Sequence, residues 1–340
     1  MTGGVMKNVL IVRLDAIGDY ILWRNVLAFI RHSAAYRSAR ITVLGNPAWR
    51  SLAEGFDAAL ADEWIWVENR RKLFRMGHEN LLPGCIWRRR VEKEQARLRE
   101  RLKARHFDEV LSLQAFPDVQ LDALVKDIAP VTIGVASAAS AACDTGFTRL
   151  LDAGTSPFVF EKNRTIASSL TEELCEVPFE LRLSAPVEKR NEVVFFLGAS
   201  HWTKRWPKKR WDALAQLVQK QYHCSVRYAG LPGERQRPLT EFAAGIAAAR
   251  VVVSNDTMAL HLAAALGVPV VGVVNGVTGR ESFWPYPASL GKRVMIVEPK
   301  RASRGLLPGI LGRQLVQYRA LASIRAGDVM SAIQLLLSAE

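Results

Sequence analysis

Residues 249–275, ARVVVSNDTMALHLAAALGVPVVGVVN, form the segment that most constrains what this chain can fold into. Val251 to Ser254 is a short apolar run without alternation, which is typical of a strand buried in a parallel sheet. A helix is expected from Met258 to Leu266, followed by a second buried strand from Val268 to Val274. Because parallel strands need a crossover connection, a strand, a helix and a strand in this order predict a parallel α/β sheet.

The turn Asn255-Asp256-Thr257, between the first of these strands and the helix, is a candidate binding site. Asp256 or Thr257 can cap the helix. The free backbone N–H groups and the helix dipole at that end favour an anion, so a diphosphate or a ribose would fit there. His261 lies four residues after Thr257 and therefore shares a helix face with it. A capped helix with a packed histidine is the simpler interpretation of the same residues.

The alternation of strands and helices extends over both halves of the chain. Strands are expected at residues 7–13, 40–44, 64–67 and 107–114 and again at 193–197, 224–229, 251–254 and 268–274, with helices at 20–31, 85–106, 211–221, 239–249, 258–266 and 327–338. Residues 183–191 lack periodicity, contain Pro186 and are expected to link the halves. We therefore predict two doubly wound domains, 1–185 and 186–340, with a terminal helix that could pack back on the first domain.

A second candidate site lies in Leu197 to Trp211, LGASHWTKRWPKKRW. A strand ends there in the small-residue turn Gly198-Ala199-Ser200, and five basic residues follow. Lys204 is expected at the carboxyl end of the sheet, on the same side as Asp256, where it could neutralise a phosphate. The alternative is a solvated basic start of a helix, which fits Lys208 and Lys209.

A third candidate site follows the first strand, in Arg13 to Tyr20, RLDAIGDY. Gly18 permits a tight turn. Asp19 would then stand at the mouth of the first half, facing an interdomain cleft, where a carboxylate could take a proton from a hydroxyl. Because Asp is also common as a helix N-cap, a capping role is the alternative.

Several functional classes lack support in the sequence. The patterns GxGxxG, GxxxxGK[ST], HExxH and GxSxG do not occur, so dinucleotide dehydrogenases, P-loop nucleotidases, zinc proteases and serine hydrolases have no motif in their favour. The four cysteines form no CxxC pair, which argues against a metal site or a disulfide framework and fits a reducing compartment. No secretory signal is visible, and no apolar run approaches the about 18 residues of a membrane span.

The positive charge of the chain is unevenly distributed. The net charge is +13, and residues 70–106 hold 13 Lys and Arg against 4 Asp and Glu. Nucleic acid, anionic lipid and phosphorylated small molecules each explain such a segment. Trp202, Trp206 and Trp211 interleave with basic residues, which could suit single-stranded nucleic acid, but packing around a helix start explains them more simply.

In this order and spacing, the three candidate segments resemble glycosyltransferase family 9, the bacterial lipopolysaccharide heptosyltransferases and their relatives. KNVLIVRLDAIGDYIL, at residues 7–22, is similar to the amino-terminal strand and Gly-Asp turn of the family. LGASHWTKRWPKKRWDAL, at 197–214, is similar to the segment that opens the second domain with a Lys-x-Trp-Pro run. RVVVSNDTMALHLAAALGVPVVGV, at 250–273, is similar to the donor-site strand and helix.

The resemblance implies a GT-B fold, in which two Rossmann-like domains face a cleft. It implies inverting transfer of a sugar from a nucleotide diphosphate sugar, often ADP-heptose, to a lipopolysaccharide-core or related saccharide. Asp19 matches the proposed general base, and Glu234, in AGLPGE, matches a carboxylate that can hold the ribose. The substrate-binding positions that the resemblance implies are Gly18, Ser200, Lys204, Glu234, Asp256, Thr257 and His261.

The resemblance also implies where the protein acts and with what. No tightly bound cofactor or metal is expected, and the partners are a nucleotide sugar and a lipid-linked saccharide, without nucleic acid. The basic segment 70–106 is not a general hallmark of the family. From its charge we expect it to dock on anionic lipid at the inner face of the inner membrane, from the cytoplasm, or on phosphates of the acceptor. A solvated charged helix is the alternative for that segment.

Two departures from the family pattern leave a second hypothesis open. Met258 stands where family members commonly have Gly. The chain also passes almost directly from Glu234 to the helix at 239–249, where family members usually place a further helix and strand beside the nucleotide base. The alternative is therefore a non-catalytic or divergent relative that binds nucleotide or saccharide without heptosyl transfer.

Overall fold

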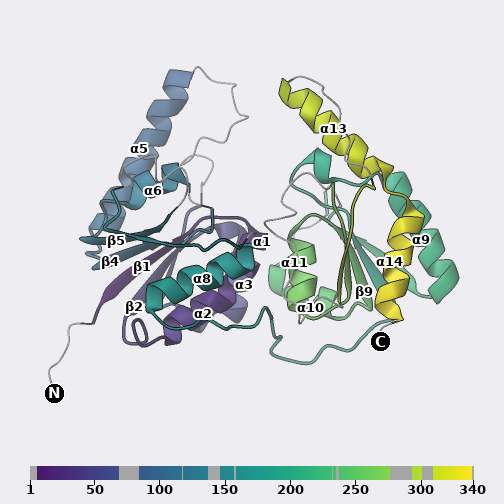
Figure 1. Ribbon diagram of the computed structural model, residues 1–340, viewed down its shortest axis with the longest axis horizontal. Helices are drawn as coiled ribbons and strands as arrows, with labels where there is room; N and C mark the ends of the chain where they lie inside the picture. Colours follow the sequence, from purple (N-terminus) through teal and green to yellow (C-terminus); the bar gives the residue numbers. More distant parts are fainter. Residues whose placement is uncertain are drawn as a thin grey trace. The chain divides into compact units, whose positions relative to one another are not determined.

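In the computed structural model the chain divides into two compact units, Met1–Pro178 and Phe179–Glu340 (Figure 1). The structure describes residues 6–68, 84–116, 118–136, 146–156, 158–231, 233–234, 237–275, 293–300 and 309–338. Each unit is a parallel sheet with helices, which confirms the predicted α/β class. Residues 179–191 are bound to the second unit, since Leu181 N donates to Ala265 O and Arg190 N to Ala248 O. A boundary between folding domains at 185/186 stays a prediction.

The sheet of the first unit has the strand order β3-β2-β1-β4-β5-β6, with every pair parallel. This is the strand order of a Rossmann fold, in which the order of the strands reverses between β1 and β4. In the register, Val12 of β1 lies between Leu44 of β2 and Ser112 of β4. The strands are β1 Asn8–Arg13, β2 Arg40–Gly45, β3 Glu63–Trp66, β4 Glu109–Ser112, β5 Val131–Val135 and β6 Arg149–Leu151.

Helices cover both faces of this sheet (Figure 1). They are α1 Ile17–Ile21, α2 Arg24–His32, α3 Arg50–Phe56, α5 Gly84–Lys103, α6 Val119–Val125 and α8 Val159–Thr171, with short 3₁₀ turns at Pro47–Trp49 and Ala58–Leu60. Leu98 and Leu102 of α5 and Leu121 of α6 pack on Leu10 and Val12 of β1. Helices α2 and α8 lie together on the opposite face.

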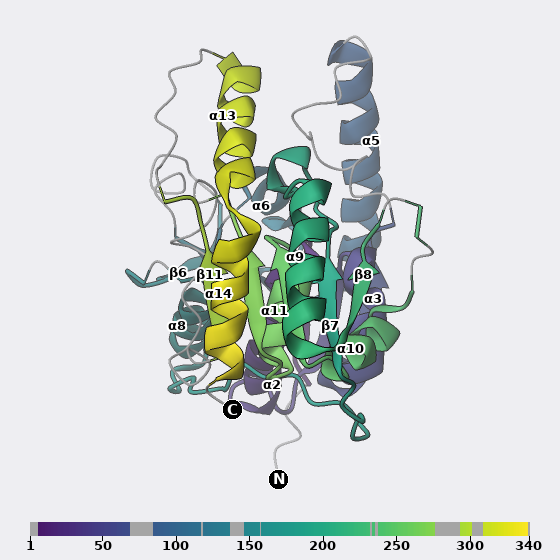
Figure 2. The same cartoon turned by 90° about the vertical axis from the view of Figure 1, so that its right-hand side faces the viewer.

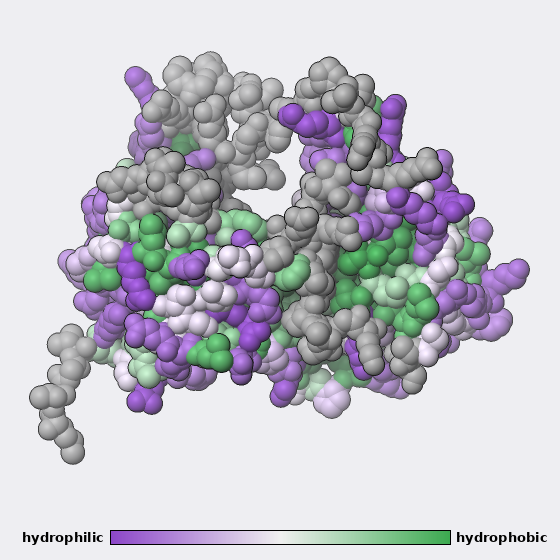
Figure 3. All heavy atoms as spheres, in the orientation of Figure 1, coloured by the Kyte–Doolittle hydropathy of each residue, from purple (hydrophilic) through white to green (hydrophobic). Residues whose placement is uncertain are grey.

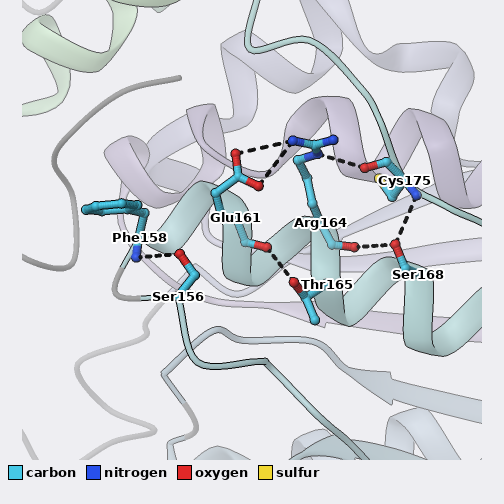
Figure 4. Close-up of polar contacts among 7 residues, drawn as sticks. All are labelled: Ser156, Phe158, Glu161, Arg164, Thr165, Ser168 and Cys175. Carbon is cyan, nitrogen blue, oxygen red and sulfur yellow. Dashed lines mark hydrogen bonds and ion pairs between the residues drawn. The ribbon is translucent and has the colours of Figure 1, made fainter. Parts of the chain in front are cut away.

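Helix α8 holds the segment that ends the first unit (Figure 4). Arg164 Nε donates to Cys175 O at 2.7 Å, and Cys175 N donates to Ser168 Oγ at 2.9 Å. Glu161 pairs with the guanidinium of Arg164 at 3.1 Å. Burial raises the pKa of the Cys175 thiol, which therefore stays protonated near neutral pH. The backbone around Cys175 is thus fixed to the helix by two hydrogen bonds.

The sheet of the second unit has the order β11-β10-β9-β7-β8, again parallel throughout. In the register, Phe196 of β7 pairs with Ser254 of β9, so the carboxyl ends of these two strands are neighbours. The strands are β7 Glu192–Phe196, β8 Ser225–Ala229, β9 Val251–Asn255, β10 Val270–Val273 and β11 Val294–Val297. The helices are α9 Lys208–Tyr222, α10 Leu239–Ala247, α11 Met258–Ala265, α13 Gly309–Ser323 and α14 Ala326–Leu337, and Trp202–Lys204 forms the 3₁₀ turn η3.

Helices α9 and α14 cover one face of this sheet, and α10 and α11 cover the other (Figures 1 and 2). The terminal helix α14 packs on α9, β10 and β11 of its own unit. Its packing on the first domain stays a prediction. Within the described residues no single helix is long and apolar enough to cross a membrane, although the bent pair Leu311–Ser323 and Ala326–Leu337 passes a test of length and composition. Among the described elements, α10 is the next one along the chain after edge strand β8.

Candidate functional site

Asn255, the last residue of β9, is fully buried and holds the turn after this strand against the segment that follows β7. Its Oδ1 accepts a hydrogen bond from Trp206 N at 3.1 Å, and its Nδ2 donates to Leu197 O at 2.9 Å. Leu197 is the first residue after β7. One amide side chain therefore joins two of the candidate segments at the carboxyl edge of the sheet.

The tryptophans of the basic segment pack as the simpler interpretation predicts. Trp206 and Trp211 are buried and lie edge to face at 5.0 Å between ring centroids. Trp206 Nε1 donates to Ile324 O, and Trp211 Nε1 donates to Trp206 O. Trp202 is 37% exposed and lies against Tyr318 of α13. Two of the three rings are therefore unavailable for stacking on nucleic acid.

Lys204 and Asp256 form an ion pair at this edge, with 2.6 Å between Nζ and Oδ2. Lys204 ends η3, and Asp256 follows β9 directly. Their side chains are 29% and 13% exposed, so the pair is reachable from solvent without being fully hydrated. The structure thus brings together two residues that the sequence expected on the same side of the sheet, and what they bind stays a prediction.

Thr257 caps α11, as the sequence allowed. Its Oγ1 accepts from Ala259 N at 3.4 Å and lies 3.2 Å from Ser254 Oγ. The helix that begins at Met258 is buried along most of its length, and His261 is buried one turn from the cap. The positive end of the helix dipole therefore lies beside the Lys204–Asp256 pair.

Glu234 and Ser200 lie in the loops that follow β8 and β7. One carboxylate oxygen of Glu234, Oε2, accepts from Gly230 N at 2.7 Å and from Leu231 N at 3.1 Å, so it stabilises its own loop. A Cβ at Gly230, whose φ is +71°, would come within 2.9 Å of Gly198 N. The two loops therefore touch only because both residues are glycines. Ser200 is exposed in the first of them.

Asp19 lies in the one-turn helix α1, close after β1. Its Oδ2 accepts from Ala16 N at 3.1 Å. Ala16 is the N-cap residue and Asp19 is the third residue of the helix, so Asp19 is not the N-cap that the sequence offered as the alternative, although its carboxylate does help to cap α1. Gly18 is the second residue of α1 and does not adopt the left-handed conformation. The tight glycine turn expected there is therefore wrong, because the chain enters a helix directly. The capping bond leaves the second oxygen of the carboxylate available for chemistry.

Buried contacts that the sequence did not reveal hold α1 in place. Tyr20 stacks on Trp49 at 4.1 Å between ring centroids, and its hydroxyl donates to Asp57 Oδ2 at 2.8 Å. Asp57 also pairs with Arg24 at 2.5 Å. Burial, and then the charge of Asp57, raises the pKa of Tyr20 well above its ordinary value, so its hydroxyl stays a donor. The residue next to Asp19 is therefore anchored by a ring stack and a buried hydrogen bond.

The Asn255 contacts predict a large loss of stability in Asn255→Ala. The truncation leaves Trp206 N and Leu197 O buried without partners, and each such group costs about 1–3 kcal/mol. We expect the free energy of unfolding in urea to fall by about 2–4 kcal/mol. Asn191→Ala, at an exposed asparagine, is the control and should change it by less than about 0.5 kcal/mol. Equal losses in the two variants would contradict the role of Asn255.

Comparison with known proteins agrees with this geometry. Residues 236–303 match the model of glycosyltransferase family 9 (heptosyltransferase). No curated protein sequence matches the chain significantly. Among solved structures, Escherichia coli heptosyltransferase WaaC with ADP-2-deoxy-2-fluoro heptose superposes with a TM-score of 0.69 at 20% identity, covering 96% of this chain and 99% of that chain.

Two further structures are similar over nearly the whole chain. A family 9 glycosyl transferase from Veillonella parvula has a TM-score of 0.65 at 18% identity, covering 98% of both chains. E. coli ADP-heptose lps heptosyltransferase II has a TM-score of 0.62 at 18% identity, covering 98% of this chain and 99% of that chain. The predicted resemblance to family 9 and the two-domain GT-B type of fold are confirmed.

Proposed function

We propose that this chain is an inverting glycosyltransferase that moves a heptose-like sugar from a nucleotide diphosphate sugar to a lipopolysaccharide-core or related saccharide. ADP-heptose is the first donor to consider, since the similar E. coli protein was solved with an ADP-heptose analogue. The observation that carries the proposal is the Lys204–Asp256 pair beside the amino terminus of α11. A cation and a helix dipole at the carboxyl edge of a Rossmann-like sheet suit a diphosphate.

On the donor side, Lys204 and the start of α11 would stabilise the negative charge that develops on the leaving diphosphate. Asp256 would hold Lys204 in place and accept a hydrogen bond from a hydroxyl of the transferred sugar. Thr257 and His261 would line the same site. Glu234 would use its second oxygen for the ribose, and Ser200 would reach the donor from the adjoining loop. Among the described residues no group of three or more His, Cys, Asp or Glu side chains could hold a metal ion, and we propose no tightly bound cofactor.

On the acceptor side, Asp19 would act as the general base. Inversion requires one in-line displacement, in which the acceptor oxygen bonds to the anomeric carbon as the bond from that carbon to the diphosphate oxygen breaks. The hydroxyl proton passes to Asp19, and the nucleoside diphosphate leaves with the electron pair of the broken bond. The capping bond to Ala16 N orients the carboxylate for this transfer.

Thermal unfolding with added sugar nucleotides tests the proposal. ADP-, GDP-, UDP- and CMP-linked sugars are compared at equal concentration, because a ligand selective for the native state must raise its stability. At 100 times Kd the gain is about 2.7 kcal/mol. We expect an ADP-linked sugar to raise Tm most and to be consumed when a saccharide acceptor is added. If none of the four raises Tm, the proposed donor site is wrong.

A binding protein without transferase activity is the second candidate. Met258 at the first position of α11 adds a side chain where the phosphates would approach. In the described part of the chain no further strand lies between β8 and α10. A rise in Tm with a sugar nucleotide that is never consumed, with any acceptor, would favour this candidate.

The basic helix α5 is the proposed contact with anionic lipid at the inner face of the cytoplasmic membrane. Its described basic side chains at Arg89, Arg90, Lys93, Arg101 and Lys103 are exposed. Part of the predicted segment, residues 70–83, lies outside the described residues. We expect co-sedimentation with vesicles that contain phosphatidylserine, falling with added salt, and none with neutral phosphatidylcholine vesicles. Equal binding to both vesicles would exclude electrostatic docking.

A further inference from the structure

Gln114 lies at the carboxyl edge of the first unit's sheet, beside the segment that carries Asp19. Strand β4 ends at Ser112, which pairs with Val12 of the neighbouring strand β1. The guanidinium of Arg13, the last residue of β1, donates to Leu113 O and pairs with Asp15 Oδ2 at 2.6 Å. The chain therefore leaves β4 through Gln114 at the same edge where it leaves β1 toward α1.

The side-chain amide of Gln114 is buried without a hydrogen bond on its nitrogen. The residue is 7% exposed, and within the described part of the chain Nε2 is fully buried and has no partner. A desolvated, unpaired group of this kind costs about 1–3 kcal/mol and is seldom left in a native protein. The nearby Ser112 hydroxyl is instead satisfied, since it donates to Asp122 Oδ1 at 2.9 Å.

We propose that Gln114 binds a hydroxyl group of the saccharide acceptor, an assignment that rests on the proposed glycosyltransferase activity. Exchanging the oxygen and nitrogen of the amide would leave an unpaired acceptor where there is now an unpaired donor. A hydroxyl satisfies either, because it both donates and accepts. An anionic group would satisfy only the unpaired donor, and a cationic group only the unpaired acceptor. A polyhydroxylated ligand therefore fits this position best.

The loop beyond Gln114 comes to the surface within two residues. Phe116, two residues further, is 48% exposed, and the Lys162 ammonium lies 5.5 Å from its ring centroid. The amide is thus buried at the base of a loop whose next turn is at the surface. An acceptor that reaches Gln114 from this side also approaches α1, since both loops leave the same edge of the sheet. Gln114 would then select and orient the acceptor, while Asp19 takes its proton.

Gln114→Leu separates a ligand-binding role from a structural one. Leucine has a similar volume and no polar atom, so removing an unpaired amide should leave Tm in the absence of ligand unchanged or slightly higher. In initial-rate assays with a lipopolysaccharide-core oligosaccharide, we expect the acceptor KM to rise about tenfold or more, because a site that pairs with a hydroxyl loses that contact. The donor KM should not change. Gln216→Leu, at an exposed glutamine of α9, is the matched control and should change neither constant.

Two results would overturn the assignment. A fall in Tm of more than about 5 °C in Gln114→Leu would mean that the amide stabilises the fold. An unchanged acceptor KM would mean that it does not touch the acceptor. If the wild type transfers no sugar, it is the proposed function that fails. Thermal shift with the same oligosaccharide then tests whether Gln114 binds the saccharide. A shift in the wild type that is lost in Gln114→Leu supports the assignment, and an equal shift or none in both refutes it.

Discussion

Replacing Asp19 by asparagine is expected to lower kcat by a factor of about 10²–10⁴, the usual contribution of a positioned general base. The amide cannot take the proton of the acceptor hydroxyl. Its oxygen can still accept from Ala16 N, as the carboxylate does now at 3.1 Å, so α1 should keep its cap. Donor binding, measured by thermal shift with the same sugar nucleotide, should be unchanged. Steady-state transfer assays at saturating substrates measure the effect.

The second unit offers a matched control for this variant. Asp328 occupies the corresponding position of α14, and its Oδ2 accepts from Arg325 N at 3.0 Å in the same capping geometry. Asp328 also pairs with Lys300 at 3.2 Å and with Arg325 at 3.5 Å. Asp328→Asn should therefore lower stability at least as much as Asp19→Asn, without the loss of kcat. If Asp19→Asn transfers sugar as fast as the wild type, or Asp328→Asn is equally impaired, Asp19 is not the base.

The sequence predicts best those parts of the fold in which local pattern and burial agree. Strands β1, β7 and β9 each contain an apolar run without alternation that is buried in a sheet, and α11 follows β9 as expected. The sequence does not reveal strand β6, because this strand has three residues and two of them are exposed. The single helix expected over 20–31 is interrupted between α1 and α2, where Trp23 packs under the Arg13 guanidinium at 4.8 Å. That contact between distant residues overrides the local helical pattern.

In the candidate site, too, some features can be predicted from the sequence and others cannot. Lys204 and Asp256 could be placed at one edge because the carboxyl ends of parallel strands lie together. The bonds that fix this edge could not be predicted, since Asn255 reaches Trp206 across 49 positions of the sequence. Asp57, which holds Tyr20, has no motif around it, and only its burial beside Arg24 reveals its role. The unpaired amide of Gln114 is likewise visible only once its surroundings are known.

Lys204→Met is expected to lower kcat/KM for the sugar nucleotide by a factor of about 10²–10³, the scale seen when one stabilising group is removed from a developing charge. Methionine keeps most of the aliphatic stem and removes the ammonium. The effect has a second cause, because Asp256 is 13% exposed and would keep a negative charge with no partner beside the donor phosphates. Global stability should change by less than about 1 kcal/mol, since the pair is partly exposed to solvent.

A double variant tests the ion pair between Lys204 and Asp256 more directly. If Asp256 without Lys204 repels the diphosphate, Lys204→Met/Asp256→Asn should bind the sugar nucleotide more tightly than Lys204→Met alone, although more weakly than the wild type. Lys208→Met is the control, because the Lys208–Asp212 pair is 65% and 45% exposed and lies on the solvent side of α9. Titration of each variant with an ADP-linked sugar measures the order. Equal weakening by Lys204→Met and Lys208→Met would show that only overall charge attracts the donor, and that the ion pair beside α11 is not its site.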